Sequence, residues 1–563
     1  MCAAIVILLS AGALLAQPQT GTIRGTVRDA LSGTAIGGVR VTVGKSATLA
    51  DASGGFSFRD VPAGEVSLSV AGEMARSFEP KKVTVVAGQD VTADLAVQGL
   101  AKISGVVTDS DGKPVSNALI TFLTREYSLG AMRYTISHST LTNDRGEYGA
   151  GPVVAANGSD VIMTMWPKDS LGQVREVKTV VSASSLGRGG PSIEAGRGYF
   201  LVASKGRGMP LDTRKIEADV TKRAHTPLVT WYIGASTADG AIPVTLGPGE
   251  RRERVDIKMP VGAGYCILGK VRADALPHGV LNAMLLDSGI GGQGVLGYMT
   301  FSMPLEKSPD AETSLNICNL SPGDYRIASW LLNESRSGFP KEFRTQLVTI
   351  ADRDVKVPLD GLPPARIAGR VEWEHPQPDR VITLTLRPMN HQNLPEETLR
   401  ATPDAPGAFQ FDRLAADEYE LQVAGLPEGT YLKDVTASGR SLLHRPIVAG
   451  GTGELRIILA SHGAHLTAQV SDDDGRAVAD AWVVAMPASA WSEVDIADTM
   501  LWGRTSVAGT WTSPMIAPGK YLVLGSKGPV DRSVEAVGRV FRARGRATEV
   551  ELAAGGNPAV KLK

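Results

Sequence analysis

Two tryptophans that flank an acidic segment late in the chain are the best candidates for a binding surface. Trp491 and Trp502 flank a predicted long loop, residues 492–500, which carries three acidic side chains. Trp231 and Tyr232 form a second aromatic candidate. A sugar-binding surface needs exposed aromatic faces beside a few polar groups. Such a ligand platform would bind at a surface rather than in a catalytic pocket. The alternative is that these rings pack in cores or against neighbouring domains.

Two cysteines, Cys266 and Cys318, lie in the same stretch of the chain, about fifty residues apart. In an exported protein, a pair of cysteines within one domain makes a disulfide possible. Two buried free thiols are the alternative, because unpaired cysteines are common in cores. The sequence indicates no zinc site here, because the two cysteines have no nearby histidine partners. We predict no metal and no cofactor.

The histidines are scattered and none forms a recognised catalytic pattern. No HExxH or HxxE motif, no G-x-S-x-G elbow and no Cys-His signature is present. His462 and His465 are close in sequence, but a spacing of three on a strand would place them on opposite faces. We interpret them as part of a linker. The sequence therefore predicts a protein that is not an enzyme, with an enzyme of unrecognised site as a third alternative.

Two acidic turns resemble half of a calcium-binding loop. Asp109 and Asp111 precede one glycine, and Asp472 and Asp474 precede another. A complete calcium loop needs more oxygen ligands and a later bidentate glutamate. These turns are more simply hairpins, although a weak site between domains stays open at this point.

The first residues are typical of a targeting segment. Residues 3–16 are all apolar or small, with the sequence Ile-Val-Ile-Leu-Leu at the centre. About 14 residues are too few to span a bilayer, but they suit the apolar region of a signal peptide. We predict a signal peptide over residues 1–16, with a buried N-terminal strand or helix as the alternative. No later apolar run is long enough for a transmembrane span in the mature chain.

The bulk composition is that of a soluble protein with several domains. The chain has 563 residues, of which 43% are hydrophobic and 21% charged. A length of this order exceeds one core. The formal net charge of -1 gives no reason to expect nucleic acid as a partner. The 63 glycines and 33 prolines suit many short strands with tight turns.

One phrase recurs along the chain and defines its organisation. In residues 103–115 it reads I-S-G-V-V-T-D-S-D-G-K-P-V, a strand, a tight turn and a second strand. Related phrases begin at Ile23, Ile267, Ile367 and Leu466. A phrase that returns at domain-sized intervals indicates an internal repeat. We therefore divide the mature chain into five repeats.

The repeats set the expected domain boundaries. We expect β-sandwiches over residues 21–99, 100–262, 263–361, 362–461 and 462–563, each with its own core. Repeat two carries an insertion of about residues 151–192, rich in glycine and serine. We expect this insertion to be the least ordered internal segment. Contacts between the domains should be modest, so relative motion is the default expectation.

Together the repeats follow one template: I-x-G-x-V, an Asp-rich turn, D-x-x-G-x-F/Y, and a corner P-G-x-Y-x-L. This template resembles the carboxypeptidase regulatory-like domain, a transthyretin-like (prealbumin-like) sandwich among the carbohydrate-binding-like folds. Repeat four departs from the template, with Ala416-Asp417 where Pro-Gly should stand. The resemblance implies an all-β chain of tandem antiparallel β-sandwich domains with little helix. It implies structural motif residues and no catalytic residue.

Tandem copies behind a signal peptide also resemble exported bacterial proteins. We therefore predict a non-enzymatic binding or structural module at the bacterial cell envelope, in the periplasm, at the cell surface or outside the cell. A carbohydrate-binding protein that uses loop aromatics is the alternative. The sequence does not identify the partner; a polysaccharide and an envelope protein are the two candidates.

Overall fold

The computed structural model places most of the repeats in detail. It describes residues 20–149, 161–165, 177–181, 192–194, 196–204, 209–211, 223, 225–272, 280–287, 299–304, 312–332, 342–359, 365–375, 381–389, 397–401, 407–526 and 528–562. The predicted signal peptide and most of the insertion in repeat two lie outside these residues. The chain divides into two compact units, one of residues 1–101 with 247–250, and one of residues 102–246 with 251–563.

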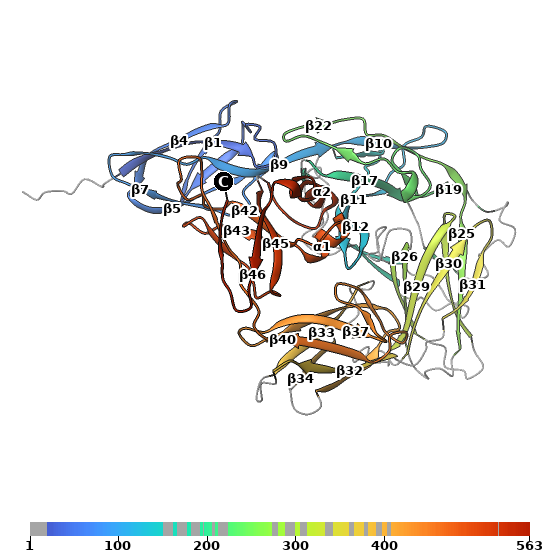
Figure 1. Cartoon of the computed structure of the whole chain (residues 1–563). Helices are drawn as coiled ribbons and strands as arrows, with labels where there is room; N and C mark the ends of the chain where they lie inside the picture. Colours follow the sequence, from blue (N-terminus) through green and yellow to red (C-terminus); the bar gives the residue numbers. More distant parts are fainter. Residues whose placement is uncertain are drawn as a thin grey trace, which may run out of the picture. The chain divides into compact units, whose positions relative to one another are not determined.

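The first unit contains repeat one, drawn in blue in Figure 1. Its core lies between two sheets and includes Ile23, Phe56, Phe58 and Leu68. The strands are β1 (Thr20–Asp29), β2 (Arg40–Val43), β3 (Ser46–Leu49), β4 (Gly55–Pro62), β5 (Gly64–Ala71), β6 (Ala75–Arg76), β7 (Lys81–Val85), β8 (Asp90–Thr92) and β9 (Leu95–Ile103).

The second unit begins with repeat two, the longest repeat. Its strands are β10 (Gly105–Asp109), β11 (Leu119–Ser128), β12 (Ala131–Leu141), β13 (Glu147–Tyr148), β14 (Val161–Met165), β15 (Val177–Val181), β16 (Ser192–Glu194), β17 (Gly198–Ser204), β18 (Met209–Leu211), β19 (His225–Pro227), β20 (Thr230–Trp231), β21 (Val244–Thr245), β22 (Arg251–Arg252), β23 (Ile257–Met259) and β24 (Val261–Ala263), with a 3-10 turn at Ala238–Gly240. β14 and β15 pair as an antiparallel hairpin within the predicted insertion.

Repeats three and four complete the middle of the second unit. Repeat three contains β25 (Tyr265–Arg272), β26 (Val280–Asp287), β27 (Met299–Pro304), β28 (Glu312–Leu320), β29 (Gly323–Leu332), β30 (Glu342–Ile350) and β31 (Val355–Pro358). Repeat four contains β32 (Ala365–Trp373), β33 (Ile382–Pro388), β34 (Glu397–Ala401), β35 (Ala408–Leu414), β36 (Glu418–Ala424), β37 (Tyr431–Ala437), β38 (Arg440–Ser441), β39 (Ile447–Val448) and β40 (Leu455–Ala460).

Repeat five adds two helices to the common sandwich. It contains β41 (Thr467–Val470), β42 (Trp482–Pro487), α1 (Glu493–Thr499), β43 (Leu501–Arg504), β44 (Thr510–Thr512), β45 (Gly519–Ser526), α2 (Val534–Ala543), a 3-10 turn at Arg544–Arg546, β46 (Thr548–Leu552) and β47 (Ala559–Leu562). These are the two α-helices in the part of the chain that the structure describes, and neither helix is long and apolar enough to span a membrane.

All five repeats share one strand topology. In each, the opening strand pairs antiparallel with the strand that precedes the corner and parallel with the closing strand. These trios are β4-β1-β8, β13-β10-β23, β28-β25-β31, β35-β32-β40 and β44-β41-β47. The facing sheet holds a hairpin and the corner strand, as in β43-β42-β45-β46. The chain is therefore all-β with tandem sandwich repeats, as predicted.

The glycine of the I-x-G-x-V phrase marks the point where the closing strand approaches the opening strand. A Cβ added to Gly105 would lie 2.2 Å from the carbonyl oxygen of Val255, and one on Gly25 would lie 2.2 Å from that of Ala93. Real Cβ atoms do not come so close to a backbone oxygen. The recurring glycine therefore has a packing role, which explains why the phrase returns in each of these repeats.

The tyrosine of the corner also has one structural role in several repeats. The hydroxyl of Tyr325 donates to the carbonyl of Ser321 at 2.7 Å, and Tyr521 donates to Ala517 at 3.0 Å. Tyr419 donates to the residue four before it at 3.3 Å, although repeat four lacks the Pro-Gly pair. The hydrogen bond joins the corner strand to the turn before it, and it does not require proline.

We expect Tyr325→Phe to lower the free energy of unfolding of repeat three by about 1–2 kcal/mol, since a buried carbonyl loses its partner. Hydrogen exchange across repeat three in graded urea would measure this change. Tyr265→Phe is the control, because Tyr265 packs on the same core but donates no hydrogen bond to any residue that the structure describes. Equal losses in the two variants would contradict a role for the corner bond.

Repeats two to five contact one another more closely than we predicted. Arg326 of repeat three lies 3.5 Å from Asp417 of repeat four, whose side chain is almost fully buried. Arg445 of repeat four lies 3.2 Å from Asp498 of repeat five. Because such polar pairs bridge successive repeats of the second unit, the prediction of modest contacts was wrong for these repeats. Sequence reasoning missed them because each pair joins residues far apart in the chain.

Candidate functional site

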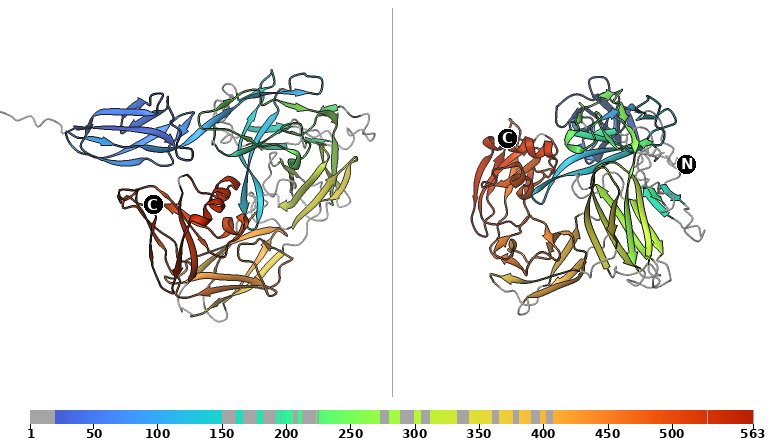
Figure 2. Two further views of the ribbon diagram at one scale, coloured as in Figure 1. Left: turned by 45° about the horizontal axis from the view of Figure 1, so that its top comes forward. Right: turned by 90° about the vertical axis from the view of Figure 1, so that its right-hand side faces the viewer.

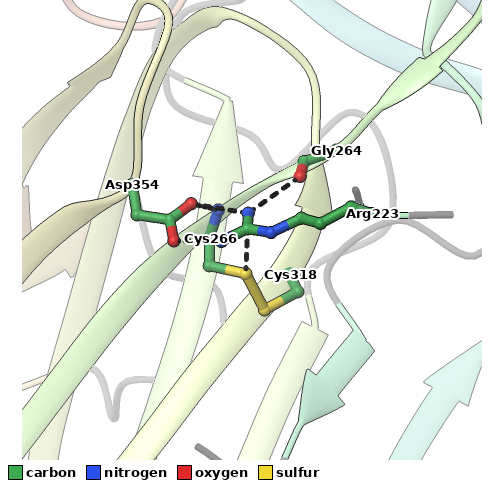
Figure 3. The surroundings of a disulfide bond; sticks show 5 residues. All are labelled: Arg223, Gly264, Cys266, Cys318 and Asp354. Atoms are coloured by element: carbon green, nitrogen blue, oxygen red, sulfur yellow. Dashed lines mark hydrogen bonds and ion pairs between the residues drawn. A yellow bond between two sulfur atoms is a disulfide. The ribbon is translucent and has the colours of Figure 1, made fainter. Parts of the chain in front are cut away.

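The structure joins Cys266 and Cys318 in a disulfide within repeat three (Figure 3). The two residues lie on the neighbouring antiparallel strands β25 and β28, with their Cα atoms 4.1 Å apart. Cys266 lies near the start of β25, and Cys318 lies near the end of β28, shortly before the Pro-Gly corner. Each residue is 2% exposed. The bond is therefore a cross-strand link inside the sandwich.

An arginine of repeat two, Arg223, lies against this disulfide. Arg223 donates from Nη1 to the carbonyl of Gly264 at 3.1 Å and lies 3.8 Å from the sulfur of Cys266. The same guanidinium forms a bidentate pair with Asp354, with 2.8 Å between Nη1 and Oδ1. Bidentate pairing fixes the plane of the guanidinium as well as its charge. Figure 3 shows the guanidinium between the carboxylate and the sulfur.

The carboxylate of Asp354 connects this arginine to the cysteine backbone. Its Oδ1 also accepts from the amide of Cys266 at 2.8 Å. Burial by itself would raise the pKa of Asp354, but the hydrogen bonds from Arg223 and from Cys266 hold that pKa below its usual value. Sequence reasoning missed both charged residues, because they stand 131 positions apart.

Strand β18 fastens the same part of repeat two to repeat three. Its residues Met209–Leu211 pair antiparallel with β28, and Met209 lies opposite Cys318. Cys318 therefore stands on a strand with a neighbour on each side, β25 and β18. The arginine pair and the added strand form a structural staple between repeats two and three, and the disulfide lies beside it within repeat three.

Arg223→Ala should lower the free energy of unfolding of repeat three by about 2 kcal/mol at neutral pH, since it leaves a largely buried carboxylate without its cation. The pKa of Asp354 is depressed in the folded state, so this stabilisation is present above the ordinary value of 3.8 and is lost as the pH falls through the folded value. Urea unfolding at pH 7 and below pH 4 measures the difference. Arg353→Ala, at an exposed neighbour, should change little.

The four aromatic residues of the predicted ligand platform do not come together in one surface. Trp231 is 2% exposed and packs with Tyr134 in a core cluster of repeat two, while Tyr232 is half-buried. Trp502 is half-buried against the helices of repeat five. Trp491 is the exception, with 71% of its surface exposed. The core position of Trp231 removes its face from any surface platform.

The acidic segment between the two tryptophans of repeat five forms a helix rather than the loop we predicted. Ser492 accepts from the amide of Asp495, and the carboxylate of Asp495 accepts from the amide of Ser492. This capping box starts α1 and is visible in the sequence as S-x-x-D. Asp498 is buried at 8% exposure, so the acidic side chains do not line an open loop.

The guanidinium of Arg544 stacks on one face of the Trp491 ring. The guanidinium carbon of Arg544 lies 4.0 Å from the ring centroid, and the same side chain donates to the carbonyl of Ala488 at 2.7 Å. This stacking fixes the ring and occupies one of its faces. One face of the ring is therefore occupied, although the ring itself is accessible.

The acidic turns use their oxygens internally. Asp109 Oδ1 accepts from the amides of Asp111 and Lys113 at 2.9 and 2.8 Å, and Asp472 makes the equivalent bonds in repeat five. Within the described ranges no group of three or more histidine, cysteine or acidic residues is placed to hold a metal ion. The turns therefore have the geometry of hairpins that the side chain of their first aspartate stabilises.

The comparison with known families concerns repeat one. Residues 22–98 match the family model of the Carboxypeptidase regulatory-like domain. Repeat one is a carboxypeptidase regulatory-like domain. The other repeats share the strand arrangement of repeat one, so the chain consists of tandem sandwiches. No curated protein sequence matches the chain.

Several solved structures of pilins are similar to this chain. The full-length major pilin of Streptococcus pneumoniae is 9% identical, with 97% of this chain and 100% of the pilin covered and a TM-score of 0.20. A variant of the major pilin subunit of Bacillus cereus is 9% identical, with 78% and 99% covered and a TM-score of 0.15. A streptococcal ancillary pilin is 9% identical, with 53% and 99% covered and a TM-score of 0.16. At these TM-scores the likenesses carry no argument about function.

Proposed function

We propose that this chain is a non-enzymatic, exported module that binds or supports other components of the bacterial cell envelope. One observation carries the proposal: the residues that recur from repeat to repeat have structural roles within each sandwich. The glycine admits the closing strand, the tyrosine ties the corner, and the aspartate holds its own turn. Because the recurring residues serve packing and turns, a partner would contact the surface residues that differ from one repeat to the next.

The staple between repeats two and three supports the same proposal. A bidentate ion pair and an added strand join the two repeats, beside a disulfide that cross-links two strands of repeat three. Such links resist separation of neighbouring sandwiches, which suits a protein that bears load or holds partners at a fixed spacing. The disulfide also suits an oxidising compartment outside the cytoplasm.

The test is a turnover assay on the purified, disulfide-intact chain together with a pull-down from envelope extract. We expect no hydrolysis of peptide or glycan substrates and stable capture of an envelope component. Hydrolysis that persists through purification would overturn the proposal. Envelope proteins and polysaccharide in the captured material should be identified separately, because either class fits a binding module.

The carbohydrate alternative now depends on Trp491, the one residue of the predicted platform that is largely exposed. We expect a glycan array to show no signal that Trp491→Ala removes, because Arg544 covers one ring face and Trp502 is packed against the helices. Val507→Ala is a control of similar exposure on the same repeat. Binding that is lost in Trp491→Ala and kept in Val507→Ala would instead support the carbohydrate function.

A further inference from the structure

The hairpin of β11 and β12 extends beyond the sandwich to which it belongs. These strands have ten and eleven residues, whereas β2 and β3 of repeat one have four each. On its other edge β11 pairs with β17 only as far as Leu123. From there to Ser128, the backbone on that edge has no partner strand within repeat two among the described residues. Unpaired strand edges are ready sites for pairing with another segment.

Repeat five supplies that segment. The amide of Tyr127 donates to the carbonyl of Arg532 at 2.8 Å, and Glu126 and Ser533 form an antiparallel bridge. Residues 532 and 533 directly precede α2, so the tip of the hairpin lies beside the N-terminal end of that helix. Figure 2 shows the two helices, in red, beside the hairpin, in cyan.

The side chains at the tip of the hairpin are also engaged. Tyr127 packs against the apolar cluster under α1 and α2, and its hydroxyl donates to Glu493 Oε2 at 2.6 Å. The amide of Gly130 donates to Asp498 Oδ1 at 3.2 Å, while Arg445 of repeat four approaches the other oxygen of Asp498. Asp498 thus joins three repeats at one buried carboxylate.

A second set of contacts lies at the base of the same junction. Arg197 forms an ion pair with Asp531, and the amide of Gly198 donates to Glu535 Oε1 at 3.0 Å. In these five contacts the acceptor is a carboxylate of repeat five, and the donor comes from repeat two or four.

We propose that the tip of this hairpin is an intramolecular latch, which closes repeats two to five into one body by docking on the helices of repeat five. The helices bury their own apolar cluster under them, so repeat five stays folded when the latch opens. The latch itself is mostly polar, with Tyr127 as its one packed ring. Opening it frees the outer edge of β11 without unfolding a core.

A cross-link tests whether the latch forms within one chain. Residues 126 and 533 face each other as a pair without mutual backbone hydrogen bonds, for which Cα atoms lie about 4.5 Å apart. That spacing admits a disulfide. We expect Glu126→Cys/Ser533→Cys to form an intrachain disulfide in dilute protein, detected by peptide mass spectrometry. Glu126→Cys/Ser506→Cys is the mismatched control and should stay reduced. Free thiols in the first variant, or a bond between two chains, would overturn the proposal.

Hydrogen exchange tests whether the latch opens as a unit. We expect Glu493→Gln/Asp498→Asn to speed exchange of the Tyr127 amide about tenfold or more, because charge-assisted acceptors are lost from the latch. Protection within β42 and β45 should persist, which separates opening from unfolding. Asp473→Asn/Asp474→Asn neutralises two exposed carboxylates of the same repeat and should leave the latch closed. Unchanged exchange in the latch variant would overturn the proposal.

Discussion

Replacing Gly105 with alanine should lower the free energy of unfolding of repeat two by about 3 kcal/mol, the upper part of the range for added groups in packed cores. The new methyl group would lie 2.2 Å from the carbonyl oxygen of Val255 and 3.0 Å from the ring of Tyr148. The same carbonyl accepts from the hydroxyl of Tyr148. Because the obstruction is backbone, β23 must move away from β10, and the buried hydrogen bond of Tyr148 is lost with it.

Gly112→Ala is the control, because it replaces a glycine of the same repeat without creating a steric clash. Gly112 lies in the turn after β10 with φ of +80°, and a Cβ there meets nothing within 4 Å. Its cost should be about 1 kcal/mol, from the left-handed backbone alone. The chain has several cores, so hydrogen exchange in graded urea, read by peptides from repeat two, is the suitable measurement. A larger loss for Gly112→Ala than for Gly105→Ala would contradict the packing role of the phrase.

Removing the disulfide with Cys266→Ala/Cys318→Ala should lower the stability of repeat three by about 4 kcal/mol in the chain-entropy model. The bond closes a loop between residues 52 positions apart, and opening it returns conformational freedom to the unfolded chain. The loss should be confined to repeat three and its added strand β18. Urea-dependent exchange of peptides from β25 and β28 would measure it.

A reductant supplies the matched comparison for the disulfide. It should destabilise repeat three of the natural chain and leave Cys266→Ala/Cys318→Ala unchanged. Titration of free thiols in the unreduced, denatured protein should detect neither cysteine. Two reactive thiols in that titration, or equal stability with and without reductant, would show that the bond does not form.

The sequence by itself determined the repeated sandwich. Its signals are local: the glycine of the opening strand, the D-x-x-G turn and the tyrosine that bonds to a residue four positions earlier. Each depends on neighbours within one repeat, so each is readable as a phrase. Even repeat four keeps its corner bond without Pro-Gly, because the bond needs the tyrosine and a backbone carbonyl.

The tertiary structure decided what happens between the repeats. Tyr127 and Glu493 are 366 positions apart, and Arg223 and Asp354 are 131 apart, so no local pattern links them. The helix at Glu493–Thr499 has only seven residues, too short to be stable alone, and it forms because its apolar side packs on the outer face of the repeat-five sheet. Pairing across such distances depends on which surfaces the folded sandwiches present. The sequence specifies each sandwich through contacts within a repeat, whereas the staple and the latch exist only once those sandwiches are packed together.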